Sequence, residues 1–369
     1  MTGVTSPDAT PGQTRVQWID TARGIGIVLV VYAHALRGLV SAKMLVPTAG
    51  ILLQDHVIYA FHMPLFFLLS GLFAGLSAAN PPADFVRKRI VTIVYPYFLW
   101  SVAQTLISIA AHQFTNRPAS LADLSRIAWE PIDQFWFLYV LAICHMLLLL
   151  PRRLFYLLVP LGLVCKLAFD GPGVLLQAAT YLPFFAVGVW LTAPRLAAIL
   201  APGMRAVVCL TAGGAVFALL LIAVGPATEG PSTLLGFLLA GAGIVATLGL
   251  ARLLGARMPV LPLLGAASLP IFLLHVIAAA AARAALKWLS ITEPAMALPL
   301  ITAAGLLVPL VVYQLAANAG LSLWLGLGYP PVSPKSRPRR GGVGYHPLEL
   351  ALAKADVEVT PRAKDQIFP

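Results

Sequence analysis

The segment that decides the fold is WIDTARGIGIVLVVYAHALRGLV, residues 18–40, which is mostly apolar but carries Asp20, Arg23, His34 and Arg37. An α-helix turns about 100° per residue, so the eleven steps from Arg23 to His34 return to nearly the same face. Asp20 and Arg37 fall on this stripe as well. The helical rise places His34 about 16 Å beyond Arg23 along the axis. The pattern predicts one polar stripe that runs from the membrane surface into an apolar helix.

Two glycines, Gly24 and Gly26, follow Arg23 closely in this segment. Small residues allow the backbones of membrane helices to approach one another. We therefore expect a neighbouring helix to pack against the first turns of this one.

The composition is that of a membrane protein. Only 11% of the 369 residues are charged, against about 25% in an average soluble domain, and the mean hydropathy is +0.87. A shortfall of this size along the whole chain indicates that lipid covers most of the surface. The net charge of +11 comes mostly from basic residues beside apolar segments, so it indicates membrane topology rather than binding to nucleic acid.

Apolar runs long enough to cross a bilayer number about ten, which predicts an all-α, polytopic membrane helix bundle. They lie at residues 22–43, 54–78, 90–111, 134–150, 154–169, 175–193, 206–225, 232–251, 260–287 and 296–325. Basic clusters fall on alternate loops, and the loops between them carry seven of the 14 Asp and Glu residues with few Lys or Arg. Because positive residues mark the cytoplasmic side, an even helix count puts both termini in the cytoplasm.

The two ends differ in composition from the apolar middle. Residues 1–17 are polar and lack the basic start and short apolar core of a cleavable signal. From residue 328 the sequence is rich in Pro, Arg and Lys, which is typical of a flexible tail. We expect a cytoplasmic N-terminal segment at 1–17, a membrane domain at 18–327 and a basic cytoplasmic tail at 328–369.

More polar side chains interrupt the later apolar runs, and such groups are usually functional in a membrane helix. His62 and Ser70 lie in YAFHMPLFFLLSGLF, where Pro64 can kink the helix. His275 lies in SLPIFLLHV at a depth similar to that of His34. His62 alone could equally form a hydrogen bond within the bundle.

A basic cluster, Arg87, Lys88 and Arg89, opens the third predicted span in FVRKRIVTIVYPYFLW. It suits a polyanion such as a nucleotide phosphate, although topology alone could account for it. Trp136 and Tyr139, in QFWFLYVL, are expected near the outer surface, where aromatic residues are common.

The remaining polar residues limit the chemistry. All Asp and Glu residues are expected in loops, tails or helix ends, and no group of residues has the spacing of metal ligands. His112 and His145 are interpreted as interface or packing residues. The buried chemistry is then imidazole and hydroxyl, with arginine at the cytoplasmic mouth.

Taken in order, these segments resemble acyltransferase family 3, and most closely its fucose 4-O-acetylase-like branch. The resemblance covers about residues 15–325 and is carried by WIDTARGIGIVLVVYAHALRG, FHMPLFFLLSG, RKRIVTIVYPYFLW, FWFLYVL, YLPFFAVGVWL and SLPIFLLH. The family consists of mostly bacterial integral membrane enzymes, which move acetyl and other acyl groups from cytoplasmic acyl-CoA to cell-surface or exported glycans. Its first-helix Arg and His match Arg23 and His34, and the basic start of its third helix matches residues 87–89.

The resemblance and the polar stripe together predict a multi-pass O-acyltransferase of the bacterial inner membrane, with acetyl-CoA or another acyl-CoA as donor substrate. The donor phosphates would rest on residues 87–89 with Arg23. His34 would accept the proton of a hydroxyl on a glycan or lipid-linked saccharide, or would carry the acyl group itself. Further candidates for orienting His34 or binding the acceptor are His62, Ser70, His275, Trp136 and Tyr139.

The alternative is a transporter or flippase for a glycan or small solute, which would use the histidines as a binding site. Proton-coupled transporters commonly keep a carboxylate deep in a helix, and none is expected here. Hydrolysis of acyl-CoA by the purified protein would distinguish the two classes, because a transporter should not show it.

Overall fold

The computed structural model describes residues 11–78, 81–111, 119–169, 171, 173–224, 231–255 and 257–328. All regular secondary structure in these ranges is helical, which confirms the all-α prediction. The chain divides into two compact units, Met1–Pro330 and Pro331–Pro369. The second unit, His112 and residues 1–10 lie outside the described ranges, and so does all but the first residue of the tail predicted at 328–369.

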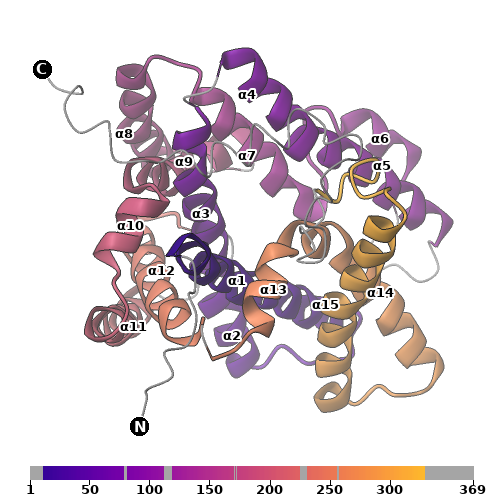
Figure 1. The fold of residues 1–369 in the computed structure, drawn as a ribbon. Coiled ribbons are helices and arrows are strands. Elements are labelled where there is room, and N and C mark those ends of the chain that lie inside the picture. Colours follow the sequence, from indigo (N-terminus) through magenta and orange to yellow (C-terminus); the bar gives the residue numbers. More distant parts are fainter. Residues whose placement is uncertain are drawn as a thin grey trace, which may run out of the picture. The chain divides into compact units, whose positions relative to one another are not determined.

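The helices follow one another with short connections (Figure 1). The first half contains α1 (Pro11–Ser41), α2 (Ala49–Tyr59), α3 (His62–Ser77), α4 (Pro82–Arg89), the π-helix η1 (Ile90–Val94), α5 (Tyr95–Ala110), α6 (Leu121–Arg126), the 3₁₀ turn η3 (Asp133–Phe135) and α7 (Trp136–Leu147). The second half contains α8 (Arg152–Ala168), α9 (Val174–Leu191), α10 (Ala193–Ile199), α11 (Met204–Val224), α12 (Leu234–Leu254), α13 (Val260–Ala266), α14 (Ser268–Trp288) and α15 (Pro294–Asn318).

Eight helical stretches within the described residues are long and apolar enough to cross a membrane, so the chain is a multi-pass membrane protein. They are Gln17–Ser41, Ala49–Gly75, Pro82–Ala110, Val174–Leu191, Met204–Val224, Leu234–Leu254, Ser268–Trp288 and Pro294–Asn318. The other two predicted spans, 134–150 and 154–169, correspond to α7 and α8, which have 12 and 17 residues. The prediction of about ten spans therefore includes two helices that are short for the apolar core of a bilayer.

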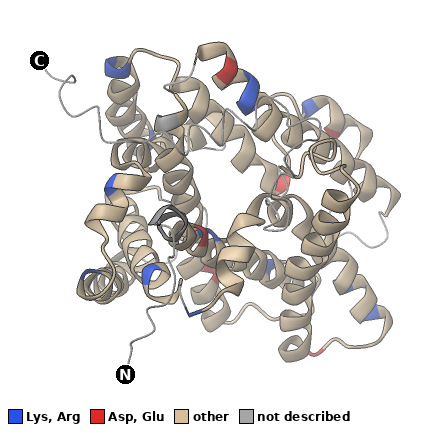
Figure 2. Ribbon diagram, in the orientation of Figure 1, with Lys and Arg blue, Asp and Glu red and all other residues tan. Residues whose placement is uncertain are grey.

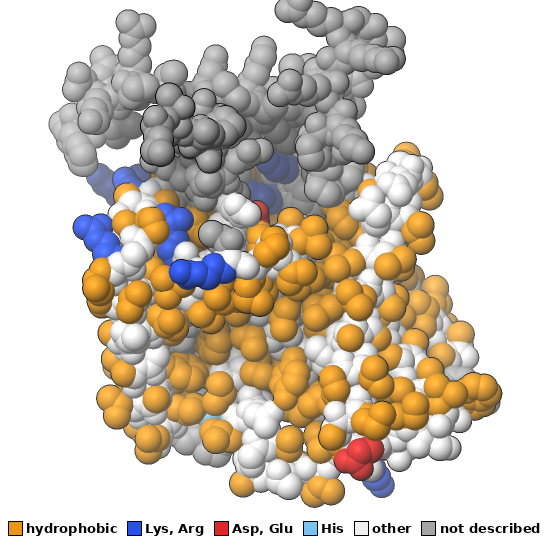
Figure 3. All heavy atoms as spheres, turned by 60° about the horizontal axis from the view of Figure 1, so that its bottom comes forward, with side chains coloured by type: hydrophobic (Ala, Val, Ile, Leu, Met, Phe, Trp, Pro, Cys, Tyr) orange, Lys and Arg blue, Asp and Glu red, His pale blue; other side chains and the backbone are white. Residues whose placement is uncertain are grey.

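The outward faces of the bundle are apolar, as a lipid environment requires. On α11, Leu219 is 69% exposed and Ile222 is 83% exposed, and α8 exposes Leu157 and Val164 in the same way. Charged residues are sparse along the helices (Figure 2). The face in Figure 3 shows a broad hydrophobic surface with Lys and Arg gathered along one edge, which is the distribution that a bilayer selects.

Helix α1 lies at the centre of the packing. It contacts α3, α12, α13, α14 and α15, so the polar stripe of its sequence faces protein rather than lipid. The helix begins at Pro11, before the start predicted at residue 22, and its candidate span begins at Gln17. Asp20 consequently lies within the helix.

Two predicted single spans are each divided into two helices. The span predicted at 54–78 is interrupted between α2 and α3, and the span predicted at 260–287 is interrupted at Ala267. In both cases a proline, Pro64 or Pro270, lies in the first turn of the second helix. Backbone N–H groups in a first helical turn have no intrahelical partner, so proline is tolerated there. One helix therefore ends and a new one begins just before each proline, instead of a single helix that kinks at it.

Close helix contacts depend on glycine. A Cβ on Gly24 would lie 2.0 Å from the carbonyl oxygen of Leu261 on α13, which confirms the close approach expected there. Gly71 on α3 and Gly188 on α9 meet in the same way, since a Cβ on either would lie 2.2 Å from a backbone oxygen of the other helix. These contacts hold α1 and α3, the helices that carry His34 and His62, against their neighbours.

Candidate active site

A cavity of about 300 Å³ lies between α1, α3, α7, α14 and the α4–η1 segment. Its apolar lining residues are Ile27, Val30, Met63, Phe66, Leu69, Ile93, Phe137, Leu138, Leu141, Leu269 and Phe272. Its polar lining residues are Arg23, Ser70, Arg89, Thr92, His145 and Ser268. A largely apolar wall with a few convergent polar groups is typical of ligand-binding sites.

Two guanidinium groups from different helices line this cavity. Arg23 pairs with Asp20 at 3.0 Å and lies 4.9 Å from the centre of the Phe73 ring. Arg89 lies 4.9 Å from the centre of the Phe85 ring, and its Nε atom is buried with no hydrogen-bond partner among the described residues. Asp20 is the one carboxylate in the described ranges that forms an ion pair with either arginine. The cavity therefore carries excess positive charge and suits an anion.

The predicted basic cluster does not act as a unit, because its three side chains leave α4 in different directions. Arg89 lines the cavity, whereas Arg87 is exposed beside Pro82 and Ile90 on another face of the segment. Lys88 is partly exposed and does not line the cavity. Successive residues of a helix differ by about 100° in direction, so only one of three consecutive side chains can face a given site.

His34 and His275 form a direct pair between α1 and α14. Their ring centroids are 4.9 Å apart and their planes meet at 78°, an edge-to-face contact. His34 is partly exposed, whereas His275 is fully buried and its Nε2 atom has no hydrogen-bond partner among the described residues. The two residues, which the sequence predicted to lie at a similar depth, are thus in direct contact.

Backbone carbonyls select the tautomer of both rings. His34 Nδ1 lies 2.9 Å from the Val30 oxygen, and His275 Nδ1 lies 2.7 Å from the Phe272 oxygen. A carbonyl only accepts hydrogen bonds, so each Nδ1 is the N–H donor and each neutral ring presents the lone pair of Nε2. Such a nitrogen can accept a proton or attack a carbonyl carbon.

The cavity and the histidine pair are adjacent but distinct. His34 and His275 are not among the residues that line the cavity, whereas Val30 and Phe272, whose carbonyls bind the two rings, do line it. The imidazoles therefore lie about one helical turn beyond the end of the cavity opposite Arg23.

His62 is the third histidine of this region. It is fully buried, donates from Nδ1 to the Ile58 oxygen at 2.7 Å and meets the Tyr59 ring edge to face at 4.7 Å. Its Nε2 atom has no hydrogen-bond partner among the described residues. His62 also lies within electrostatic reach of His34, so it can support the pair.

The C-terminal end of α1 is tied to α2 by an ion pair that the sequence did not predict. Arg37 binds Asp55 through two contacts of 2.7 Å and lies over the Tyr59 ring at 3.4 Å. All carboxylates are expected in loops, tails or helix ends, but Asp55 lies within α2, inside a candidate span that begins at Ala49. The pairing makes this position tolerable for a carboxylate.

Of the other predicted candidates, Ser70 lines the cavity but Trp136 and Tyr139 do not. The Trp136 ring packs against Tyr181 with centroids 5.1 Å apart, and the Tyr139 hydroxyl donates to the Ala128 oxygen at 2.9 Å. Both aromatic residues therefore support α7 and its preceding loop rather than contact the cavity.

His145 was interpreted from the sequence as a packing or interface residue, yet it lines the cavity together with Arg89. Both residues contact the Phe85 ring. The helix that carries His145 has only 12 residues, so it displays no polar stripe comparable to that of α1. Its position became visible only through the packing of α7 against α4.

An all-helical membrane bundle with a basic cavity, and beside it a histidine pair whose Nε2 atoms form no hydrogen bond to the described residues, has the architecture of a membrane-embedded enzyme. The comparison of the sequence with family models agrees with this class. The chain belongs to the acyltransferase 3 family, because the family model described as an acyltransferase domain matches residues 16–314.

Two curated relatives are both described as nodulation protein NolL. The protein from Sinorhizobium fredii (strain NBRC 101917 / NGR234) is 32% identical over 124 residues, which cover 32% of each chain. The protein from Mesorhizobium japonicum (strain LMG 29417 / CECT 9101 / MAFF 303099) is 31% identical over 133 residues, which cover 35% of this chain and 34% of the relative. The chain thus spans about a third of the length of these relatives. No solved structure matches the chain.

Proposed function

We propose that the protein is an integral membrane O-acyltransferase that moves an acetyl group from cytoplasmic acetyl-CoA to a hydroxyl of an exported or cell-surface glycan. It would work in the bacterial inner membrane with both termini in the cytoplasm. The observation that carries the proposal is the arrangement of Arg23 and Arg89 in one cavity, with the His34–His275 pair beyond its opposite end. Membership of the acyltransferase 3 family favours this reaction over transport.

The size of the cavity suggests how the donor would bind. At about 300 Å³ it lies at the lower end of the range for ligand pockets, so it suits the pantetheine arm and acyl group rather than the whole coenzyme. The nucleotide would remain at the cytoplasmic mouth, with its phosphates reaching Arg23 and Arg89. The arm would pass the apolar wall toward Val30 and His34.

The histidines supply the reaction chemistry. In direct transfer, the acceptor hydroxyl oxygen attacks the thioester carbonyl carbon while His34 Nε2 accepts the hydroxyl proton. The new C–O bond forms, the C–S bond breaks, and the imidazolium returns its proton to the departing thiolate. The Nδ1–H bond to Val30 holds the ring in the required tautomer throughout, and the ring of His275 supports it from the side.

A two-step route uses the same residue. His34 Nε2 would attack the thioester to form an acyl-imidazolium and release the thiolate. The acceptor hydroxyl would then attack this intermediate, so that the C–N bond breaks, neutral His34 is restored and the hydroxyl proton passes to the thiolate. Rapid acid quenching followed by mass spectrometry of the peptide that contains His34 separates the two routes, because only the second leaves an acyl group on it.

The proposed function is tested with purified protein in lipid nanodiscs and radiolabelled acetyl-CoA. The acceptor is surface polysaccharide freed of its O-acyl esters by mild alkali. We expect label in the polysaccharide, released again by alkali as an ester would be. In parallel, glycans from cells with and without the gene should differ in acyl content. Unchanged glycans, together with no consumption of acetyl-CoA by the folded protein, would exclude the proposal.

A further inference from the structure

A second polar site lies beyond the histidines, where two buried glutamines face each other. Gln104 on α5 and Gln134 on η3 are 7% and 5% exposed. Gln134 Nε2 donates to Gln104 Oε1 at 2.8 Å, and Gln104 Nε2 donates to Asp133 Oδ2 at 3.0 Å and to Gln134 Oε1 at 3.3 Å. Buried amides in a membrane protein are costly, so two buried amides that contact each other, with one of them also bound to a carboxylate, indicate a use.

The three side chains are not saturated by these contacts. Each amide has two N–H donors and an oxygen that accepts twice, and each carboxylate oxygen accepts more than once. One N–H of Gln134 and the Oδ1 atom of Asp133 have no hydrogen-bond partner among the described residues. Asp133 is exposed and has a φ of +42°, a backbone conformation that a non-glycine residue rarely adopts. The cluster therefore offers donors and acceptors side by side at a surface.

Helix lengths place this cluster at the level of His34. Gln134 and His145 are eleven residues apart on η3 and α7, the same spacing that separates His34 from Arg23 on α1. His145 and Arg23 line the same cavity at its basic end, beside Arg89. Eleven helical residues span about 16 Å. Counted from the basic end of the cavity, Gln134 therefore lies as far from His145 as His34 lies from Arg23, which gives the two residues a similar depth.

Side-chain contacts support the same placement. Phe135, next to Gln134, packs edge to face on Phe272 with ring centroids 6.4 Å apart. Phe272 provides the carbonyl that binds His275. Asp133 itself lies within electrostatic reach of His34. The amide–carboxylate cluster thus lies on the far side of the histidine pair from the arginines.

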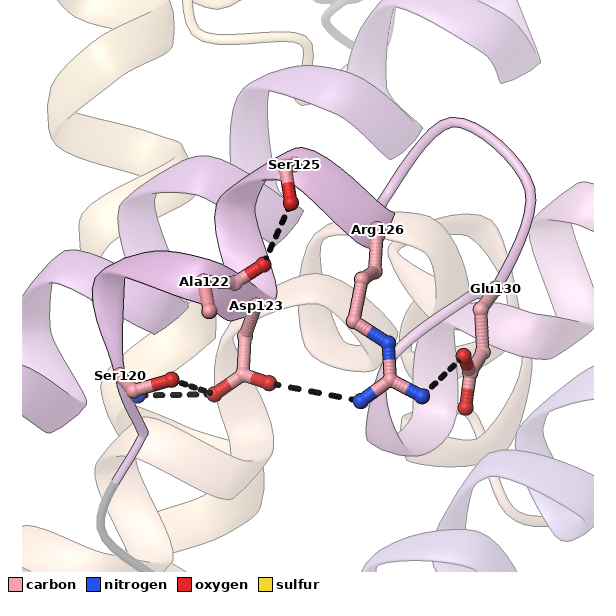
Figure 4. Close-up of polar contacts among 6 residues, drawn as sticks. All are labelled: Ser120, Ala122, Asp123, Ser125, Arg126 and Glu130. Atoms are coloured by element: carbon pink, nitrogen blue, oxygen red, sulfur yellow. Dashed lines mark hydrogen bonds and ion pairs between the residues drawn. The ribbon is translucent and has the colours of Figure 1, made fainter.

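The loop before the cluster is braced by its own polar contacts (Figure 4). Ser120 and Asp123 form a capping box at the start of α6, and hydrogen bonds from the Ser120 amide and hydroxyl hold the pKa of the Asp123 carboxyl below its usual range. Arg126 bridges Asp123 and Glu130. A braced segment can present side chains in a defined geometry.

Two tyrosines hold the same loop against the bundle. Tyr97 on α5 and Tyr139 on α7 donate their hydroxyl protons to consecutive backbone oxygens, those of Ile127 and Ala128. Their rings meet edge to face with centroids 5.3 Å apart. Tyr139, predicted as a supporting residue, therefore acts as a positioning residue for the segment that leads into the cluster.

We propose that Gln104, Asp133 and Gln134 form the acceptor subsite, which binds neighbouring hydroxyls of a saccharide and holds one of them at His34. This inference rests on the proposed function. A saccharide presents adjacent hydroxyls that both donate and accept, and a carboxylate beside two amides matches them in both respects. The donor and acceptor then approach His34 from opposite ends of the site.

The test uses Gln134→Leu and Asp133→Asn, with Gln314→Leu as the matched control. Gln314 also donates to a neighbouring amide, that of Asn318 at 2.9 Å, but it lies on an exposed face of α15. Asp133→Asn carries little risk to folding because the side chain is exposed. Two activities are measured for each folded variant: transfer to alkali-treated surface polysaccharide, and slow hydrolysis of acetyl-CoA in its absence.

We expect both site variants to raise the KM for polysaccharide by tenfold or more, while hydrolysis and the KM for acetyl-CoA stay within about twofold of wild type. The control should match wild type in every measurement. An unchanged polysaccharide KM in Asp133→Asn, or equal losses in hydrolysis and transfer, would overturn the subsite. Failure of the proposed function is recognised separately, because the wild-type protein would then consume no acetyl-CoA at all.

Discussion

The imidazole rings of His34 and His275 meet edge to face with centroids 4.9 Å apart, and both rings donate from Nδ1 to a backbone carbonyl of their own helix. The pair joins α1 to α14 at the point where the cavity ends. Because both tautomers are determined by the backbone, each neutral ring keeps the lone pair of its Nε2 atom, and that of His275 is buried. His34 is the more accessible of the two, so the proton transfer is assigned to it.

His34→Ala should abolish acyl transfer while the protein still inserts, folds and binds acetyl-CoA. Loss of a general base costs about 10²–10⁴-fold in rate, and loss of a covalent carrier should cost at least as much. Single-turnover transfer of radiolabelled acetyl groups measures the effect, and thermal melting checks the fold. His56→Ala is the control, since His56 is a buried histidine of α2 that faces Ser232 and Leu239 instead. Near wild-type turnover in folded His34→Ala would end the assignment.

Arg89→Gln and Arg23→Gln should weaken binding of acetyl-CoA, whereas Arg87→Gln should not. Hydrogen bonds to charged groups contribute about 1.5–3 kcal/mol. Arg23 is partly exposed to solvent, which screens its charge, so its contribution should lie in the lower half of this range. We therefore expect Kd to rise about tenfold or more for the two cavity arginines. Isothermal titration calorimetry with acetyl-CoA measures it. Equal effects of Arg87→Gln and Arg89→Gln would show that general surface charge, rather than the cavity, attracts the donor.

Gly71→Ala should destabilise the protein strongly, because the new Cβ would lie 2.2 Å from the Phe185 oxygen on α9. Backbone atoms cannot move aside as a flexible side chain can, so α3 and α9 would have to separate. Thermal melting in detergent should show a marked drop in Tm. Gly214→Ala on α11 is the control, since its Cβ would meet nothing within 4 Å. A similar Tm for both variants would contradict the packing of α3 on α9.

Both termini are expected in the cytoplasm. The reason is the alternation of basic loops, which mark the cytoplasmic side. Reporter fusions at the N-terminus and after residue 335 should both report a cytoplasmic location, and a fusion after Ala119, between α5 and α6, should report the opposite side. An extracytoplasmic N- or C-terminal reporter would remove the even number of crossings and would reverse the proposed direction of donor entry.

Much of the fold could be predicted from the amino-acid sequence because the bilayer restricts the outcome so strongly. In lipid, every backbone polar group must be satisfied within its own segment, so apolar runs of sufficient length become helices. The stripe of Arg23 and His34 followed from helical geometry alone, and so did the expectation of close packing at Gly24. These features depend on residues near one another in the sequence, or on the period of the α-helix, which the lipid environment favours.

The site depended on contacts between distant segments, which no local pattern encodes. Arg89 rather than Arg87 lines the cavity because of how α4 packs on α7, and the same packing brings in His145. Asp55 lies inside a helix because Arg37, eighteen residues earlier, reaches it. The sequence by itself determined which segments are apolar enough for a membrane and which face of α1 is polar, since both follow from hydrophobicity and helical period. Only the tertiary structure decided which polar side chains meet, because helices that are equally apolar outside are arranged by the close fit of their small and large side chains.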